Sequence, residues 1–433
     1  MVREFDSVHS GRISLGPTYS FLEAFVKRSI LAGMVLLIAH GSFAADALIA
    51  KDDKSRIEII RRGKVWEKPE WVTETASGYE FSSKLDVLKG SPVKGNSLLL
   101  EKDDVYCQLT DKDLEKGNGK TPKFKCRLMQ MNAKTGKPEL VLDEKGKTDD
   151  IKIKYTVPGT VKYNPEVFAE VVGTRLLWAL GFGADRMFGV KRVHCYGCTS
   201  DPFNNLVIDP ETLVNPMVFT AAAIEKKAKG TEIVAMNAAE GWEFSEAMAN
   251  YPADASEGHY QFKYRDSLRL LMSVLQHTDN KAENQRMLCL DKPAPATAEL
   301  CSSVQLIVQD IGTSLGVGLT GLKINKFDYP KWSQKPVWKD AASCKPNYGT
   351  SLDSSVARAV SEYGRDHLAK LLAGFIKGDA GRKRVEDLFR AANVEMRNDE
   401  SGNVQLWADA FIAKAKQVIA PAGEANSAFK CKM

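Results

Sequence analysis

A polar stretch at 277–285, HTDNKAENQ, constrains the fold of this 433-residue chain more than any other part of it. It follows a stretch with apolar residues at helical spacing, 264–276. Two short apolar runs come next, RMLCL at 286–290 and VQLIV at 304–308, and they predict a β-hairpin. The hairpin ends at a second polar motif, DIG at 310–312. A helix, a polar loop, a hairpin and an Asp-x-Gly in this order require a fold that mixes α and β elements.

The first residues have the pattern of a secretory signal peptide. Lys27 and Arg28 precede an apolar run of about a dozen residues, too short for a membrane-spanning helix of roughly 20. Small residues at positions 42 and 44 then fit a cleavage site after Ala44. We therefore predict a signal peptide over 1–44 with an unusually long first part. The alternative is an uncleaved membrane anchor, and we expect no membrane span after cleavage.

The cysteines agree with export. An even number of cysteines behind a signal peptide predicts disulfide bonds. The simplest pairing joins sequence neighbours: Cys107–Cys126, Cys195–Cys198, Cys289–Cys301 and Cys344–Cys431, which uses all 8 cysteines. The HCYGC stretch at 194–198 also fits a redox motif or half of a zinc site, but no second CxxC exists to complete four zinc ligands.

The remaining pattern changes from strands to helices along the chain. Strands are predicted at 123–131, 138–143, 150–157 and 187–195, and helices at 164–181, 354–376, 382–394 and 404–419. We therefore predict an α+β class with a strand-rich half over 45–235 and a helical half over 236–433.

Two of these elements carry charged residues of interest. In DIKIKYTV at 150–157, Ile151, Ile153 and Tyr155 alternate with Lys152 and Lys154. The next helix has Asn164 as N-cap, Pro165 at its first position and Gly181 as its stop.

The order of these elements resembles the protein-kinase-like superfamily. Its catalytic loop has the form H-x-D-x-K-x-x-N, which 277–284 matches, and a metal-binding D-x-G ends the next hairpin, as at 310–312. The following TSLG is similar to secreted and phosphoinositide-type kinases, and EVVGTRLLWALGF resembles the glutamate helix of secreted Golgi-type kinases. The resemblance covers about 120–320 and implies a two-lobed fold with a strand-rich N-lobe and a helical C-lobe.

The resemblance also implies roles for the polar residues. Phosphoryl transfer depends on positioning and charge neutralisation. Asp279 is expected to orient the acceptor hydroxyl and take its proton, and Lys281 to neutralise the transferred phosphate. Asn284 and Asp310 are expected to hold Mg²⁺ or Mn²⁺ through oxygen atoms. His277 is more simply interpreted as a structural loop residue.

The nucleotide-binding pair is less firmly fixed by the sequence. Lys154 is expected to contact the phosphates of ATP, held by an ion pair with Glu170. Lys152 competes for the first role and Glu166 for the second. Lys154 is preferred because it lies nearer the strand end, and Glu170 because of its spacing to the LGF stretch.

Two departures from the family pattern affect the subclass. The spacing from Asp279 to Asp310 is long, and the loop between Cys289 and Cys301 is expected to absorb it. No G-x-G-x-x-G precedes the lysine strand, so NAKTGKP at 132–138 is the candidate for a turn that covers the phosphates. An A-P-E end to an activation segment is also missing.

These patterns lead to one functional hypothesis and two rivals. We expect an exported, periplasmic or extracellular kinase-like phosphotransferase that moves the γ-phosphate of ATP to a hydroxyl of a protein, glycan or small molecule. The first rival is a catalytically weak nucleotide-binding or interaction protein, and the second is a structural protein with no site. A formal charge of only +5 gives no indication of a nucleic-acid partner.

Overall fold

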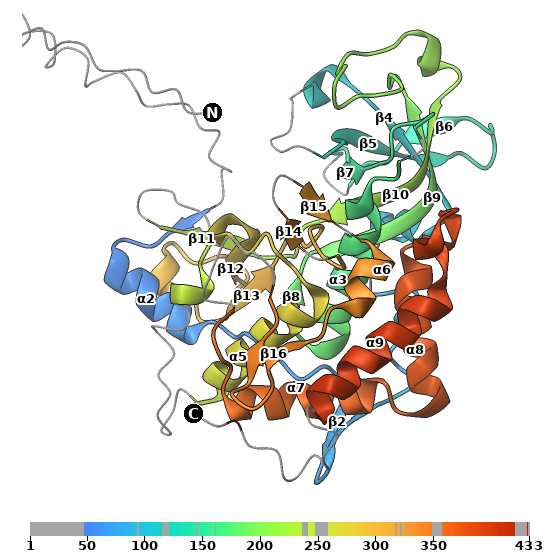
Figure 1. Ribbon diagram of the computed structural model, residues 1–433. Helices are drawn as coiled ribbons and strands as arrows, with labels where there is room; N and C mark the ends of the chain where they lie inside the picture. Colours follow the sequence, from blue (N-terminus) through green and yellow to red (C-terminus); the bar gives the residue numbers. More distant parts are fainter. Residues whose placement is uncertain are drawn as a thin grey trace, which may run out of the picture. The chain divides into compact units, whose positions relative to one another are not determined.

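The computed structural model describes residues 47–433, apart from 93–94, 115–120, 144–145, 161, 236–240, 247–258, 317, 321–322, 326, 349–356, 421–430 and 432–433 (Figure 1). These residues belong to one compact unit. The predicted signal peptide, 1–44, lies outside them. Among the helices that the structure describes, none has both the length and the apolar content needed to cross a membrane.

Five strands form a closed ring. They are β4 (Asp104–Gln108), β5 (Lys123–Met131), β7 (Asp150–Lys154), β9 (Arg186–Tyr196) and β10 (Met217–Lys226), with β6 (Pro138–Leu140) added to β5. The ring closes because β4 pairs with β9 in parallel and with β5 antiparallel. Alternate side chains of each strand point inward, so Ile151, Ile153 and Tyr155 are buried in a core of their own.

A second sheet lies in the other part of the unit. Its order is β1 (Leu48–Ile49), β11 (Thr231–Val234), β12 (Gln285–Cys289), β13 (Val304–Val308) and β8 (Gly183–Ala184). The β12–β13 pair is the predicted hairpin. Since β1 pairs with β11, the residues after 47 join this sheet and not the ring, which differs from their expected place in the strand-rich half. The boundary at 235/236 itself stays a prediction.

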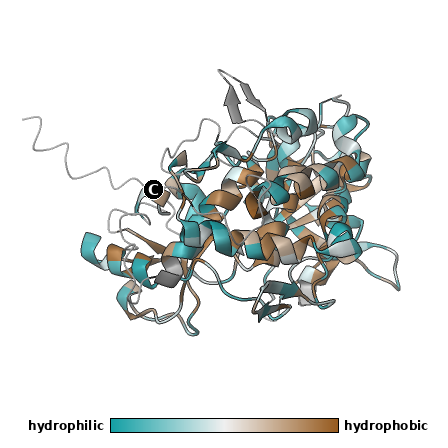
Figure 2. Cartoon of the chain, turned by 60° about the horizontal axis from the view of Figure 1, so that its bottom comes forward, coloured by the Kyte–Doolittle hydropathy of each residue, from teal (hydrophilic) through white to brown (hydrophobic). Residues whose placement is uncertain are grey.

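The helices pack mainly around the second sheet, in a larger core. They are α2 (Asp53–Arg62), α3 (Pro165–Leu180), α5 (His259–Leu275), α6 (Tyr329–Gln334), α7 (Glu362–Phe375), α8 (Gly378–Ala391) and α9 (Val404–Ile419). Figure 2 shows brown apolar residues concentrated within this packed region and teal polar residues outside it. Helix α3 also contacts β9, β10 and α8, so it joins the ring to the helices.

The remaining described elements are short. They are β2 (Val72–Thr75), β3 (Gly78–Phe81), β14 (Gly318–Thr320), β15 (Lys323–Asn325), β16 (Trp338–Asp340) and β17 (Lys345–Pro346), each paired with its neighbour, and short 3₁₀ turns. Strands and helices in these proportions confirm the α+β class. The two-lobed arrangement stays a prediction.

Most predicted elements are confirmed, although α8 begins at Gly378, four residues before its predicted start, and α7 begins well after its predicted start. Helix α3 has the predicted caps, because Asn164 accepts from the N–H of Glu166 and Gly181 adopts φ 92°. Helix α7 begins at Glu362, not at 354 as predicted. The reason is that Ser361 caps the helix, while its own N–H donates to Asp266 at 2.7 Å and fixes the incoming chain.

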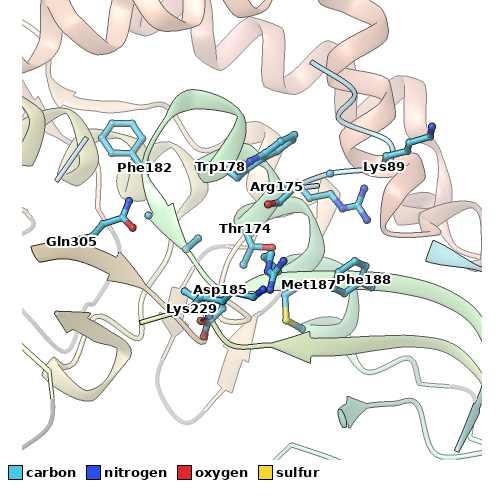
Figure 3. A pocket seen from close by; sticks show the side chains of 16 residues that line it. Lys89, Thr174, Arg175, Trp178, Phe182, Asp185, Met187, Phe188, Lys229 and Gln305 are labelled. Carbon is cyan, nitrogen blue, oxygen red and sulfur yellow. Dashed lines mark hydrogen bonds between the residues drawn. The ribbon is translucent and has the colours of Figure 1, made fainter. Parts of the chain in front are cut away.

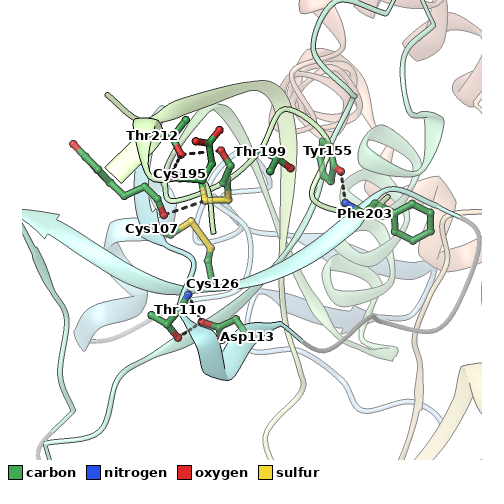
Figure 4. The surroundings of a disulfide bond; sticks show 12 residues. Cys107, Thr110, Asp113, Cys126, Tyr155, Cys195, Thr199, Phe203 and Thr212 are labelled. Carbon is green, nitrogen blue, oxygen red and sulfur yellow. Dashed lines mark hydrogen bonds between the residues drawn. A yellow bond between two sulfur atoms is a disulfide. The ribbon is translucent and has the colours of Figure 1, made fainter. Parts of the chain in front are cut away.

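The four disulfides join sequence neighbours, as the simplest pairing predicted. Cys107–Cys126 crosslinks β4 to β5 beside Cys195–Cys198 (Figure 4). Cys289–Cys301 closes the loop of the β12–β13 hairpin. With both cysteines of HCYGC in a disulfide, that stretch offers no thiolate for zinc.

Candidate functional site

The candidate site is centred on Lys154, the last residue of β7. Its side chain is 1% exposed and contacts three carboxylates. The Nζ atom makes a short contact with Glu170 Oε1, lies 2.9 Å from Asp310 Oδ1 and lies 3.4 Å from Glu166 Oε2. The structure therefore brings together three sequence segments: β7, α3 and the end of the hairpin.

Strand register explains why this lysine and not its neighbour lies there. Ile153 points into the ring, so Lys152 and Lys154 point outward. Lys154 lies opposite Lys123 and Ala223 at the end of the ladder, beside α3. Lys152, two residues earlier, pairs instead with Glu225 at 2.5 Å and keeps a side chain that is 34% exposed.

The helix supplies two glutamates because they lie one turn apart. Glu166 and Glu170 are four residues apart on α3 and therefore share a face. Both are buried, at 6% and 2% exposure. By sequence alone they were alternatives for one role, whereas the structure places both carboxylates against Lys154.

The DIG motif fits closely against α3. A Cβ atom on Gly312 would lie 2.7 Å from Cγ of Glu166 and 2.9 Å from Oε1 of Glu170, so this position excludes a side chain. Ile311 is fully buried against Gly173 of α3, whose added Cβ would lie 2.9 Å from it. Two glycines therefore allow the hairpin end and the helix to approach each other.

Backbone contacts fix the polar loop to the segment after DIG. Thr278 N–H donates to Thr313 O at 3.1 Å, and Asp279 N–H donates to Thr313 Oγ1 at 3.1 Å. At the hairpin base, Gln309 N–H donates to Asn284 O at 2.9 Å. Asn284 and the residue after Gln309, Asp310, therefore lie on either side of the open end of the hairpin.

His277 is structural in character. It is 1% exposed, its Nδ1 lies 3.3 Å from Ser314 Oγ, and its Nε2 is buried with no hydrogen-bond partner in the described part of the chain. Burial lowers its pKa to about 4, so the imidazole is neutral at pH 7.

The cluster contains more acidic than basic groups, since three carboxylates surround one lysine. Burial alone would lower the pKa of Lys154, but Glu170, Asp310 and Glu166 raise it well above its usual value. Burial and the neighbouring acids raise the pKa of Glu170, although Lys154 opposes this shift. For Asp310 the effect of burial is outweighed by Lys154 and by hydrogen bonds, which hold its pKa well below the usual range. Asp310 is therefore ionised.

The oxygen atoms present fit a hard divalent cation. Asp310 is 43% exposed at its side chain, and carboxylate oxygens of Glu166, Glu170 and Asp310 lie within 4.8 Å of one another. Asn284 donates its Nδ2 to Asp279 O at 2.8 Å, and its Oδ1 has no partner among the described residues. Asp310 and Asn284 could therefore hold Mg²⁺ or Mn²⁺ from opposite sides of the hairpin base.

The positions of Asp279 and Lys281 do not test their predicted roles. Asp279 is partly exposed on the polar loop. Lys281 is exposed, and its backbone carbonyl accepts from the N–H of Asn284 at 3.0 Å. Their roles stay predictions.

One sequence expectation is wrong. The turn at 132–138 joins β5 to β6 at the end of β5 opposite to Lys123, the residue that pairs with Lys154. Eight residues of extended strand separate the two ends by roughly 27 Å. This turn is therefore too far from Lys154 to cover phosphates bound there.

Three residues near the cluster were missed. Thr121 donates to Glu166 at 2.6 Å, Lys123 lies opposite Lys154, and Glu225 pairs with Lys152. Burial, helped by Lys152 and Lys154, lowers the pKa of Lys123. Only the pairing of β5 with β7 identifies Lys123, and no local pattern reveals that pairing.

Comparisons with known proteins give little further guidance. No protein-family model and no curated protein matches the chain. A solved structure described as a Helicobacter pylori proinflammatory kinase, CtkA, matches with 11% identity and a TM-score of 0.32. The match covers 73% of this chain and 93% of that one. A TM-score of this size is too low to establish a shared fold.

Proposed function

We propose that this chain is an exported kinase-like phosphotransferase that moves the γ-phosphate of ATP to a hydroxyl acceptor with a divalent metal. The observation that carries the proposal is the contact of Lys154 with both Glu170 and Asp310. A lysine for phosphates and an acid for a metal then lie within one cluster, which is the combination that phosphoryl transfer needs.

In this proposal each residue has one task. Lys154, oriented by Glu170, contacts the nucleotide phosphates, and Asp310 with Asn284 holds Mg²⁺ or Mn²⁺, which neutralises phosphate charge when bound. Asp279 accepts the proton of the acceptor hydroxyl, and Lys281 lies on the solvent side, where it can meet the transferred group. The loop that carries Asp279 is fixed by Thr313, so its position does not depend on the substrate.

Export is part of the same proposal. Disulfides persist in oxidising compartments and are rare in the cytosol, and four of them are present here. This supports a periplasmic or extracellular location.

One observation favours a second candidate, a kinase-fold protein that binds nucleotide without transfer. Lys154 is already surrounded by three carboxylates and is 1% exposed, as a purely structural ion cluster would be. Such a protein needs no metal-dependent turnover.

The test uses the purified, disulfide-intact protein with ATP and Mg²⁺ or Mn²⁺. Mass spectrometry should detect a phosphorylated product, on the chain itself or on added hydroxyl acceptors, and calorimetry should detect metal-dependent ATP binding. Binding without any product would support the second candidate. No binding of nucleotide in the presence of either metal would refute both.

A further inference from the structure

A cavity of about 300 Å³ lies beside α3, and none of the six predicted site residues lines it (Figure 3). Thr174, Arg175 and Trp178 of α3 form one wall, and β8 with the start of β9 forms another. The segments at 89–91 and 228–229 complete it. This volume is at the lower end of the range for small-molecule sites.

The charges around this cavity are mostly positive. Lys89, Arg175, Arg186 and Lys229 line it, and Asp185 is the one acidic residue among the lining residues. Within the described part of the chain, none of these four basic side chains forms an ion pair. Some buried basic residues elsewhere in the same molecule do, as Lys154 and Arg269 illustrate. A concave surface with unpaired cations attracts an anion.

Arg175 is the most informative of the four. It is only 7% exposed, and its Nη1 donates to the carbonyls of Val87, at 2.9 Å, and Leu88. Its Nε is buried with no hydrogen-bond partner among the residues that the structure describes. Burial lowers its pKa to about 10, and the charges of Asp86 and Glu101 oppose this shift only in part. Burying a charged group without an ion-pair partner is costly, and a bound anion would reduce this cost.

The backbone is shaped around the same guanidinium. Gly90 adopts φ 81°, and a Cβ atom there would lie 3.1 Å from Cζ of Arg175. Only glycine lets the chain pass this close in the left-handed region. The segment at 89–91 therefore holds Arg175 in place and brings Lys89 to the cavity.

The other lining residues indicate what else the ligand carries. Trp178, Phe182 and Phe188 provide aromatic surface, and Figure 3 shows Trp178 and Phe182 on the same side of the cavity. Trp178 packs on Trp71 with ring centroids 4.6 Å apart, which fixes one of its faces. Apolar walls with a few charged groups are typical of sites for small organic molecules.

We propose that this cavity binds a small organic anion, in which a phosphate or carboxylate group meets Arg175 and Arg186 and a flat apolar group meets Trp178. The site is distinct from the Lys154 cluster and does not depend on the proposed phosphotransferase activity. Helix α3 connects the two sites, since Thr174 Oγ1 donates to Glu170 O at 2.7 Å.

Calorimetric titrations with phenyl phosphate, benzoate, inorganic phosphate and uncharged phenol test this proposal. Phenyl phosphate, benzoate or both should bind, and the choice between them identifies the anionic group. Phenol should bind at least tenfold more weakly, because a charged hydrogen bond contributes about 1.5–3 kcal/mol and about 1.4 kcal/mol is tenfold. Inorganic phosphate should be similarly weak, since it lacks the flat group. Equal binding of phenol and both anions, or no binding of any probe at millimolar concentration, would overturn the proposal.

Variants locate the binding. Arg186→Gln and Lys229→Gln should each lower the affinity for the anion about tenfold or more. Both variants leave the structural hydrogen bonds of Arg175 intact. Lys339→Gln, an exposed lysine of β16, is the matched control and should bind normally. Asp310→Asn should also bind normally, because Asp310 lies outside the cavity. If Asp310→Asn weakens binding while Arg186→Gln does not, the probe occupies the Lys154 cluster and the proposal is wrong.

Discussion

Lys154 Nζ donates to Asp310 Oδ1 at 2.9 Å, although 156 residues separate the two in sequence. One residue ends a strand of the closed ring, and the other follows the last strand of the β12–β13 hairpin. The contact therefore joins the two sheets of the molecule at the point where the polar motifs meet. Its neighbours, Glu166 and Glu170, come from the helix that packs on both.

The two lysines of β7 should differ in how much their replacement affects activity and stability. Lys154→Met should abolish ATP-dependent activity and should lower the free energy of unfolding by about 3–5 kcal/mol, because it leaves buried acids without their cation. Lys152→Met is the matched control, and it should cost at most about 1 kcal/mol, since its ion pair is partly exposed. Denaturant unfolding and a phosphate-transfer assay measure the two effects. Loss of activity in Lys152→Met alone would mean that the nucleotide lysine has been misassigned.

The two aspartates should separate binding from turnover. Asp310→Asn should lose metal-dependent ATP affinity, because the carboxylate is the exposed charged ligand of the cluster. Asp279→Asn should keep near-native ATP affinity, while its turnover falls by about 10²–10⁴, the usual effect of removing a positioned acid–base group. Calorimetry with and without Mg²⁺ and a transfer assay provide the readouts. Unchanged binding and turnover in both variants would contradict the roles assigned to them.

The contact between Gly173 and Ile311 can be tested by a double-mutant cycle. Gly173→Ala should destabilise the fold by about 1–3 kcal/mol, because the new methyl group overlaps Ile311, although alanine is the better helix residue. Ile311→Ala should also destabilise it, by about 2–5 kcal/mol, through a cavity. The double variant should be less destabilised than the sum, since the added and removed groups share one space. Additive values would mean that the two residues do not pack together in solution.

The disulfides should contribute unequally. In the chain-entropy treatment, the Cys344–Cys431 bond, with a separation of 87 residues, is worth about 4–5 kcal/mol, and Cys195–Cys198, with a separation of 3, about 1–2 kcal/mol. Replacing both cysteines of a pair by serine should therefore lower Tm more for the first pair. Thermal unfolding followed by circular dichroism provides the comparison. A thiol titration of the unreduced, unfolded protein should find no free thiols, and six or more would contradict export.

Asp185 should make stability depend on pH in an identifiable way. Burial raises its pKa from 3.8 to about 6, although its Oδ1 accepts from the N–H of Ala228. The folded protein therefore binds the proton of Asp185 more tightly than the unfolded chain does. The stabilising contribution of this proton to the free energy of unfolding is present near pH 4 and is lost as the pH rises through 6. Asp185→Asn should accordingly be more stable than wild type at pH 8 and equal to it near pH 4. Comparing the Tm of the variant with that of wild type at each pH removes the contribution of His277, which has the opposite sign and is present in both proteins. A Tm difference that does not change with pH would contradict the raised pKa of Asp185.

Local patterns predicted the parts of this structure that local physics decides. The caps of α3 follow from Asn164, Pro165 and Gly181, and the faces of β7 follow from alternation. The hairpin followed from two apolar runs, with a cysteine at or near the loop end of each. Each of these features is determined by residues within a few positions of it in the sequence.

The parts that depend on distant residues were not predictable. The parallel pairing of Val105 with Val193 closes the ring, and nothing near either valine specifies it. Likewise, Leu48 pairs with Ile233, which lies about half of the described chain away in sequence, and this pairing places the early residues in the second sheet. Glu166 is an intermediate case. Its spacing from Glu170 indicates a shared helix face, so both acids were predictable as neighbours of one lysine.

Closure of the ring affects the tendency of the protein to aggregate at high concentration. Because β4 bonds to both β5 and β9, it offers no free row of backbone donors to another chain. Among the described strands of this sheet, β6 lies at a margin; it is three residues long and begins with Pro138, a residue without an N–H. Short margins with proline oppose intermolecular strand pairing. This ring should therefore resist edge-to-edge aggregation even at high local concentration.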